Sequence, residues 1–163
     1  MAVRILALGD EGRRVLPSLE RAVRAAWRTA GDVDLAVDCA GDGAPGARRV
    51  LARWCDRDRA DVVLTVGRAG HLREDYAPGI TEGLIERRLP GIEERMCLAP
   101  PARPEDLLFR GRAGLRKATL LVNLPARAAR AAAIVRFLAP VLGHALDKAR
   151  GDGAECGRPE GAR

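Results

Sequence analysis

The sequence predicts an α/β fold of three layers, in which helices cover both faces of a mostly parallel sheet. Short apolar runs at residues 3–8, 62–64 and 120–122 have the composition of strands that are buried on both faces. Several of the segments around them carry apolar residues at spacings of three and four, the period of an amphipathic helix. Strands that alternate with helices are typical of such a sheet.

The N-terminal part is predicted to hold two strand–helix units. After the first strand, an apolar face over residues 15–30 predicts a helix that ends at Gly31, with Pro17 in its first turn. Residues 33–39 alternate apolar and acidic, which indicates a strand with one less-covered face. Residues 40–46 have the composition of a loop. The next segment is predicted to be a helix with one apolar face, formed by Ala47, Val50, Leu51, Trp54 and Cys55.

The middle of the chain is predicted to contain two short helices and a stiff excursion. Residues 80–89 have a helical pattern that Pro90 stops. Pro90 is expected to open a second helix through Met96 and Leu98. Residues 99–104 (APPARP) predict an extended segment stiffened by prolines.

The C-terminal part is predicted to be a strand, a long helix and a tail. An apolar stripe over residues 134–146 predicts a helix with a kink or a break at Pro140. The last residues are rich in glycine, proline and charge and lack apolar periodicity. We therefore expect one domain over residues 1–149 and a disordered tail over residues 150–163.

Composition narrows the function classes. No apolar run approaches the roughly 20 residues that cross a bilayer, and the strand-like N-terminus lacks a signal-peptide pattern, so we expect a cytoplasmic protein without a membrane partner. The net charge of +6 comes from arginines spread along the chain, and one Tyr and two Phe make no aromatic platform for bases. This argues against a nucleic-acid partner, whereas a phosphorylated small molecule suits a modest positive charge.

The cysteines indicate neither a zinc site nor a disulfide framework. There are four of them, without a C-x-x-C pair or a Cys/His spacing typical of zinc. Cys39, Cys55 and Cys97 have apolar neighbours and are predicted to be small, reduced core residues.

The strand at residues 62–64 leads into the segment with the clearest functional signal. Gly67 and Gly70 follow it, and the acidic Glu74 and Asp75 come next. Ligands of parallel sheets bind at the carboxyl ends of strands, and glycines there let the backbone approach a phosphate. A plain turn would also explain the two glycines.

Six segments match motifs of one known family in order and spacing. They are residues 65–70 (TVGRAG, against T-T-G-G-T-G), 74–79 (EDYAPG, against R-D-x-T-P-[DE]), 89–94 (LPGIEE, against [IL]-P-G-F-x-E), 109–114 (FRGRAG, against S-R-x-x-A-G), 120–125 (LLVNLP) and 140–146 (PVLGHAL). On these segments the chain resembles the MoaB/Mog family of molybdenum-cofactor biosynthesis proteins. The resemblance covers about residues 33–150 and implies the family's α/β fold and its assembly as a homotrimer or a hexamer of two trimers.

The resemblance implies an adenylyltransferase reaction, in which the terminal phosphate of molybdopterin attacks the α-phosphate of ATP with Mg²⁺ and releases pyrophosphate. Asp75 corresponds to the motif aspartate and is the first candidate for a catalytic residue and for the magnesium ligand. Asp42 is the nearest match to the aspartate of an upstream P-D-x motif and is the second catalytic candidate. The residues implied to bind the pterin or the nucleotide are Thr65, Gly67, Arg68, Gly70, Pro78, Arg110, Asn123 and Pro125.

Each site motif also departs from the family pattern. Arg68 and Ala69 replace Gly-Thr, and Glu74 reverses the charge of an arginine. Ala77 and Gly79 replace the motif threonine and its acidic partner. Elsewhere, Phe109 stands for the motif serine and Ala126 for the glycine after N-L-P.

The departures leave three hypotheses open. The chain is an active molybdopterin adenylyltransferase, a non-catalytic molybdopterin-binding paralogue, or an oligomeric scaffold with a decayed site. Two residues also have simpler explanations. Asp75 could cap the helix that follows it, and Asp42 could be a solvated turn or capping residue.

Overall fold

The computed structural model of the chain describes the backbone of residues 1–28, 33–40, 43–100 and 103–149, and the side chains in these ranges up to Val141. Asp42 and the tail from residue 150 lie outside the described residues, so the predictions made for them stay predictions. None of the helices within the described ranges is both long and apolar enough to cross a membrane.

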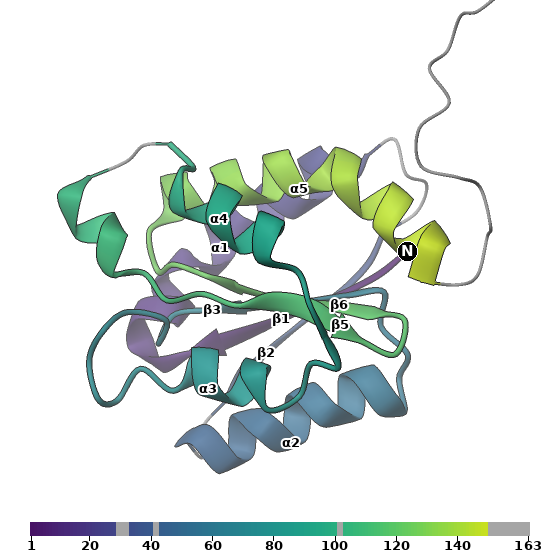
Figure 1. Cartoon of the computed structure of the whole chain (residues 1–163), viewed down its shortest axis with the longest axis horizontal. Coiled ribbons are helices and arrows are strands. Elements are labelled where there is room, and N and C mark those ends of the chain that lie inside the picture. Colours follow the sequence, from purple (N-terminus) through teal and green to yellow (C-terminus); the bar gives the residue numbers. More distant parts are fainter. Residues whose placement is uncertain (29–32, 41–42, 101–102, 150–163) are drawn as a thin grey trace, which may run out of the picture.

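A six-stranded sheet forms the middle layer, with the strand order β2-β1-β3-β6-β5-β4 (Figure 1). The first four strands in this order are parallel, and β5 and β4 continue the sheet in antiparallel pairing. The strands are β1 (Ala2–Leu8), β2 (Asp34–Ala40), β3 (Val62–Val66), β4 (Arg87–Arg88), β5 (Ala113–Arg116) and β6 (Thr119–Leu124). The predicted fold class, a three-layer α/β fold with a mostly parallel sheet, is thereby confirmed.

Helices cover both faces of the sheet, as Figure 1 shows. Helices α1, α4 and α5 pack on one face, and α2 and α3 pack on the other. The helices are α1 (Gly9–Ala26), α2 (Gly43–Asp56), α3 (Ala77–Glu82), α4 (Pro90–Cys97), the 3₁₀ helix η1 (Pro104–Leu108) and α5 (Ala128–Ala149). Every residue of β3 is buried, because the strand lies in the centre of the sheet and faces a helix layer on each side.

Helix α1 begins and ends earlier than predicted. It ends at Ala26, with Trp27 as its C-cap, so the predicted end at Gly31 is wrong. The placement of Pro17 in its first turn is also wrong. Gly9 has a φ of +67°, which turns the chain directly from β1 into the helix. Gly12 packs so closely on the end of β3 that a Cβ there would lie 2.2 Å from the carbonyl oxygen of Val66. The first turn thus contacts the sheet through a glycine. A glycine adds nothing to the apolar periodicity, so the sequence pattern did not show where the helix begins. Pro17 lies in the middle of the helix and is exposed.

The predicted helix over residues 80–89 is also wrong. Helix α3 starts before it, with Pro78 in its first turn, and Gly83 ends it. Arg87 and Arg88 instead form β4, which pairs with β5 at the edge of the sheet. Strand pairing therefore overrides the helical period here.

Three smaller expectations also need correction. Helix α2 begins at Gly43, so the predicted loop over residues 40–46 is shorter. Helix α5 continues through Pro140, so the break is wrong and the kink stays a prediction; buried residues such as Ile134 and Leu138 hold its apolar face on the sheet. Cys55 is buried as predicted, but Cys39 is exposed because it lies on the edge strand β2, and Cys97 is half-buried.

Candidate functional site

A cavity of about 460 Å³ opens beyond the carboxyl end of β3. The loop that follows β3 forms one wall, and η1 with the start of the segment after β6 forms the other. The residues that line it are Glu11, Arg68, Ala69, Gly70, His71, Leu72, Asp75, Arg103, Glu105, Asp106, Leu108, Phe109, Pro125, Ala126 and Arg127. This position, where the strands of a parallel sheet end, is where such folds bind ligands.

Asp75 closes the turn that precedes α3. It is 8% exposed, and its Oδ2 accepts a hydrogen bond of 2.9 Å from the backbone N–H of Leu72. The N-cap position of α3 is Tyr76, and no side chain caps it. The helix-capping explanation for Asp75 is therefore wrong, and its carboxylate is held at the cavity wall by the loop itself.

Gly70 leaves room for the carboxylate of Asp75, and Arg110 holds the backbone of the same loop. A Cβ on Gly70 would lie 2.7 Å from Oδ2 of Asp75, so a side chain there would push the carboxylate away. The guanidinium of Arg110 donates from Nε to the carbonyl oxygen of Gly70 at 2.8 Å and from Nη2 to that of Asp75 at 3.2 Å. Arg110 itself does not line the cavity, and its bonds fasten the loop in place.

Arg68 lies between the loop and the start of α1. Its backbone N–H donates to Oε1 of Glu11 at 2.8 Å, and its φ is +50°. Its guanidinium packs on Gly9, where a Cβ would lie 2.8 Å from Nε. The side chain that replaces a family glycine is thus folded onto α1 at the cavity rim.

Of three further predicted residues, Pro125 lines the cavity, whereas Gly67 and Pro78 do not. Gly67 has a φ of +95° and lies so close to β1 that a Cβ would be 2.4 Å from the carbonyl oxygen of Leu8. Pro78 is buried in the first turn of α3, whereas Pro125 lines the cavity.

Thr65 and Asn123 belong to one buried hydrogen-bond network. Asn123 is fully buried, and its Nδ2 donates to Oγ1 of Thr65 at 2.8 Å and to Oγ1 of Thr81 at 2.7 Å. Its Oδ1 accepts from the backbone N–H of Arg112 at 2.9 Å. The network ties β3, β6 and α3 together, and none of its three side chains lines the cavity.

The second wall contains a buried carboxylate that the sequence did not indicate. Asp106 is 8% exposed, and it accepts from the backbone N–H of Arg103 and from Nη1 of Arg127, both at 2.8 Å. Nη1 of the fully buried Arg130 lies 2.5 Å from its Oδ1. Burial raises the pKa of Asp106, but these hydrogen bonds and the Arg130 charge outweigh burial and lower the pKa overall. The one available signal was a proline followed by two acidic residues, a helix-start pattern.

For a metal ion, Asp75 is the cavity carboxylate that the motif selects. Within the described ranges, no group of three or more His, Cys, Asp or Glu side chains could hold a metal ion. Mg²⁺ at nucleotide sites takes one or two carboxylates, with substrate phosphates and water as its other ligands. The Leu72 bond uses one oxygen of Asp75, so the residues present fit an ion that the substrate helps to hold.

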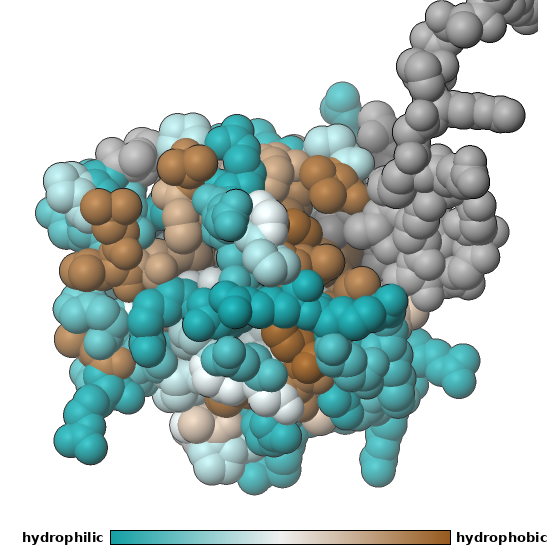
Figure 2. All heavy atoms as spheres, viewed as in Figure 1, coloured by the Kyte–Doolittle hydropathy of each residue, from teal (hydrophilic) through white to brown (hydrophobic). Residues whose placement is uncertain are grey.

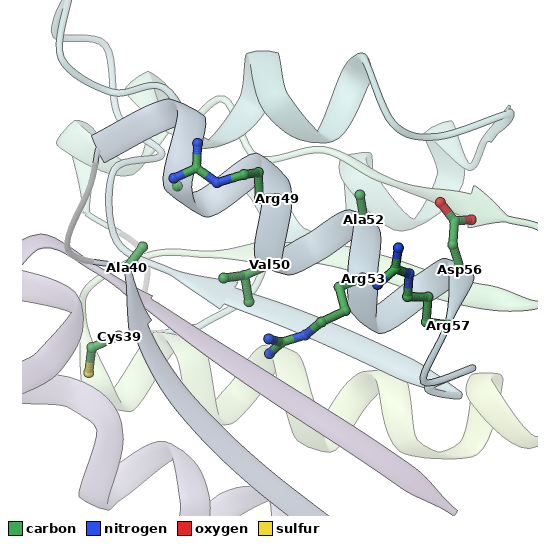
Figure 3. A pocket seen from close by; sticks show the side chains of 9 residues that line it. Cys39, Ala40, Arg49, Val50, Ala52, Arg53, Asp56 and Arg57 are labelled. Carbon is green, nitrogen blue, oxygen red and sulfur yellow. The ribbon is translucent and has the colours of Figure 1, made fainter.

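A second hollow of about 670 Å³ lies between α2 and the end of β2 (Figure 3). Arg49, Arg53 and Arg57 follow one another along this side of α2 and its end. Asp56 in its lining is paired with Arg116 and Lys117, which lower its pKa to about 2. None of the described residues that the family motifs select lines this hollow, so the cavity beside Asp75 is the candidate site.

Comparisons with known proteins agree with the α/β fold described above. No model of a protein family matches the chain. The chain is 35% identical over 78 residues to the molybdopterin adenylyltransferase of Helicobacter pylori (strain ATCC 700392 / 26695), a match that covers 47% of this chain and 44% of that protein. It is 29% identical over 97 residues to the molybdenum cofactor synthesis protein cinnamon of Drosophila melanogaster, covering 59% of this chain and 16% of that protein. The chain thus matches less than half the length of these curated relatives.

Solved structures match over nearly the whole chain. The molybdopterin biosynthesis enzyme MoaB of Thermus thermophilus has a TM-score of 0.75 and 34% identity, covering 92% of this chain and 96% of that one. The tungsten cofactor synthesizing protein MoaB of Pyrococcus furiosus has a TM-score of 0.70 at 17% identity, covering 91% and 96%, and shares the fold. Because one in three residues is identical to the Thermus protein across almost its full length, the chain belongs to the MoaB/Mog family of molybdenum-cofactor biosynthesis proteins.

Proposed function

We propose that this protein is a molybdopterin adenylyltransferase that works in the cavity beside Asp75. In this reaction an oxygen of the terminal phosphate of molybdopterin forms a bond to the α-phosphorus of ATP. The bond from that phosphorus to the bridging oxygen breaks, and pyrophosphate leaves with the electron pair. The observation that carries the proposal is the position of the motif aspartate, held by the loop at the wall of a cavity at the carboxyl ends of the strands.

The cavity lining carries both signs of charge, with the carboxylates of Glu11, Asp75, Glu105 and Asp106 beside three guanidinium groups, of which that of Arg127 is paired with Asp106. Arg68, Arg103 and Arg127 line the cavity and bring guanidinium groups, which bind phosphate oxygens well. Their role is to bring the two phosphates together and to stabilise the charge that develops in the transition state. Asp75 would hold Mg²⁺ together with the substrate phosphates, and the ion would supply further charge neutralisation.

The test is the release of pyrophosphate from Mg-ATP when freshly prepared molybdopterin is added to the purified protein. We expect pyrophosphate only when both substrates are present. No pyrophosphate, with an authentic family enzyme active in the same assay, would refute the proposal.

A non-catalytic molybdopterin-binding paralogue is the second candidate. It is favoured by Arg68, whose bulky side chain occupies the rim where the family has glycine, and by the acidic Glu74 in place of an arginine. Binding of molybdopterin without turnover would support this candidate. If the protein bound neither substrate, the remaining hypothesis would be an oligomeric scaffold.

The family's assembly as a homotrimer or hexamer is part of the proposal. Leu98 and Leu107 are 70% and 83% exposed, and large apolar side chains on a surface often lie in contacts between subunits. The apolar residues in Figure 2 gather on the side that carries α4 and η1. Sedimentation equilibrium should give three or six times the mass of the chain, and a monomer would contradict the assembly.

A further inference from the structure

Phe109 brings an aromatic ring to the cavity at a position where the family has serine. The residue is half-buried and comes directly after η1. It packs against the apolar clusters on both faces of the sheet and still forms part of the cavity lining. A serine would fill this position only in small part, so the ring changes the shape and the chemistry of the wall.

The ring is held from two sides before any ligand arrives. The guanidinium carbon of Arg130 lies 5.4 Å from the ring centroid, in a cation–π contact. The tip of the ring lies on Gly111, where a Cβ would be 2.1 Å from Cζ. Arg130 is fixed in turn by its ion pair with Asp106 and by its bond of 3.0 Å to the carbonyl oxygen of Met96.

The cavity lining is both apolar and charged. Leu108, Phe109 and Pro125 give apolar surface, and Arg68 and Asp75 are among the charged residues. A ligand that uses both kinds of lining carries a flat ring that can stack and a phosphate group. Molybdopterin and ATP each have such a ring, a pterin and an adenine.

We propose that Phe109 is a stacking platform for the planar heteroaromatic ring of one of these substrates, and thus a specificity-determining residue of this chain. The inference rests on the proposed function. Aromatic rings attract one another in offset stacks, and a ring already fixed by Arg130 and Gly111 loses little freedom when a ligand binds. Serine offers no such surface.

The experiment compares Phe109→Leu and Phe109→Trp with the wild type in equilibrium dialysis. The probes are molybdopterin and, separately, the non-cleavable α,β-methylene analogue of ATP. Leucine keeps an apolar side chain but has no π surface, so we expect about tenfold weaker binding of one probe and unchanged binding of the other. The probe that weakens identifies the ring that stacks.

Phe109→Trp should restore that affinity and report on the contact. Trp27 and Trp54 are buried, so their emission serves as a background measured in the wild type. The probe that stacks should quench the additional emission of the new tryptophan. Quenching decides between stacking and packing, because a side chain that only fills space does not bring the ring of the probe onto the indole.

Phe137→Leu is the matched control. Phe137 also lies under an arginine, with the guanidinium carbon of Arg95 at 5.4 Å from its centroid, but it lines a separate groove beside α4. We expect this variant to bind both probes like the wild type. Equal affinity of Phe109→Leu and wild type for both probes, or the same loss in Phe137→Leu, overturns the inference alone. A wild type that binds neither probe overturns the proposed function as well.

Discussion

The carboxylate of Asp75 occupies the space that a side chain on Gly70 would need. A Cβ at residue 70 would lie 2.7 Å from Oδ2 of Asp75. The same Oδ2 is held by the N–H of Leu72, so it cannot move without breaking that bond. Gly70 thus leaves room for the carboxylate of Asp75 in its observed position. This role does not require a positive φ at Gly70.

Gly70→Ala should therefore displace Asp75 and lower turnover. A shift of about 1 Å at a reacting group can cost on the order of a hundredfold in rate, and we expect a loss of that order in pyrophosphate release. The matched control is Gly79→Ala in α3, where a Cβ would meet nothing within 4 Å. That variant should keep full activity and gain up to about 1 kcal/mol in the free energy of unfolding. Equal activity of the two variants would contradict the positioning role of Gly70.

Asp75→Asn separates the charge of the side chain from its structural bond. The amide oxygen of asparagine can still accept from Leu72, so the loop should keep its conformation. The loss of one negative charge beside the phosphates should reduce pyrophosphate release by about a hundredfold or more, with the oligomer unchanged. Glu74→Gln, at an exposed neighbour, is the control for charge alone. Wild-type rates in Asp75→Asn would refute the catalytic role.

Asn123→Ala should act on stability more than on chemistry. The change leaves the hydroxyls of Thr65 and Thr81 and the N–H of Arg112 without their buried partner. We expect a loss of about 2–4 kcal/mol in the free energy of unfolding by urea. Ser18→Ala, which removes an exposed bond to Arg21, should cost less than about 0.5 kcal/mol. A variant of Asn123 that keeps its stability and loses molybdopterin would instead indicate direct contact with the ligand.

The sequence was most informative where a strand lies under both helix layers. The apolar runs in β1, β3 and β6 were predicted because each of these strands is almost wholly buried. The edge strand β4 consists of the two exposed residues Arg87 and Arg88 and forms only through its pairing with β5. Because this strand depends on tertiary pairing, the local sequence pattern did not predict it.

In the candidate site as well, local features could be predicted from the sequence and long-range contacts could not. Asp75 and Gly70 lie in one loop, so a motif could place them together in advance. The ion pair of Asp106 with Arg130 joins η1 to α5, two segments that meet only in the folded chain. The stacking of Arg130 on Phe109 depends on the same long-range packing. Neither contact has a spacing that could be recognised in the sequence.

Asp106 should make stability depend on pH in the acid range. Its pKa in the folded protein lies below the ordinary value of 3.8, because hydrogen bonds and Arg130 outweigh the effect of burial. A carboxyl whose folded pKa is depressed adds stability above its unfolded pKa, and this stability is lost as the pH falls through the folded pKa. The contribution should be complete at pH 7 and shrink from about pH 4 downwards.

Asp106→Asn removes the charge that neutralises the buried Arg130. We expect this variant to lose about 3 kcal/mol in the free energy of unfolding at pH 7, because a buried charge without its partner is strongly unfavourable. Urea unfolding at pH 7, 5 and 3 should show the gap from the wild type closing at the lowest pH. Asp58→Asn breaks an exposed pair with Arg53 at 3.7 Å and should cost less than about 1 kcal/mol throughout. A gap for Asp106→Asn that stays constant down to pH 3 would mean that the charge of Asp106 does not hold Arg130 in place.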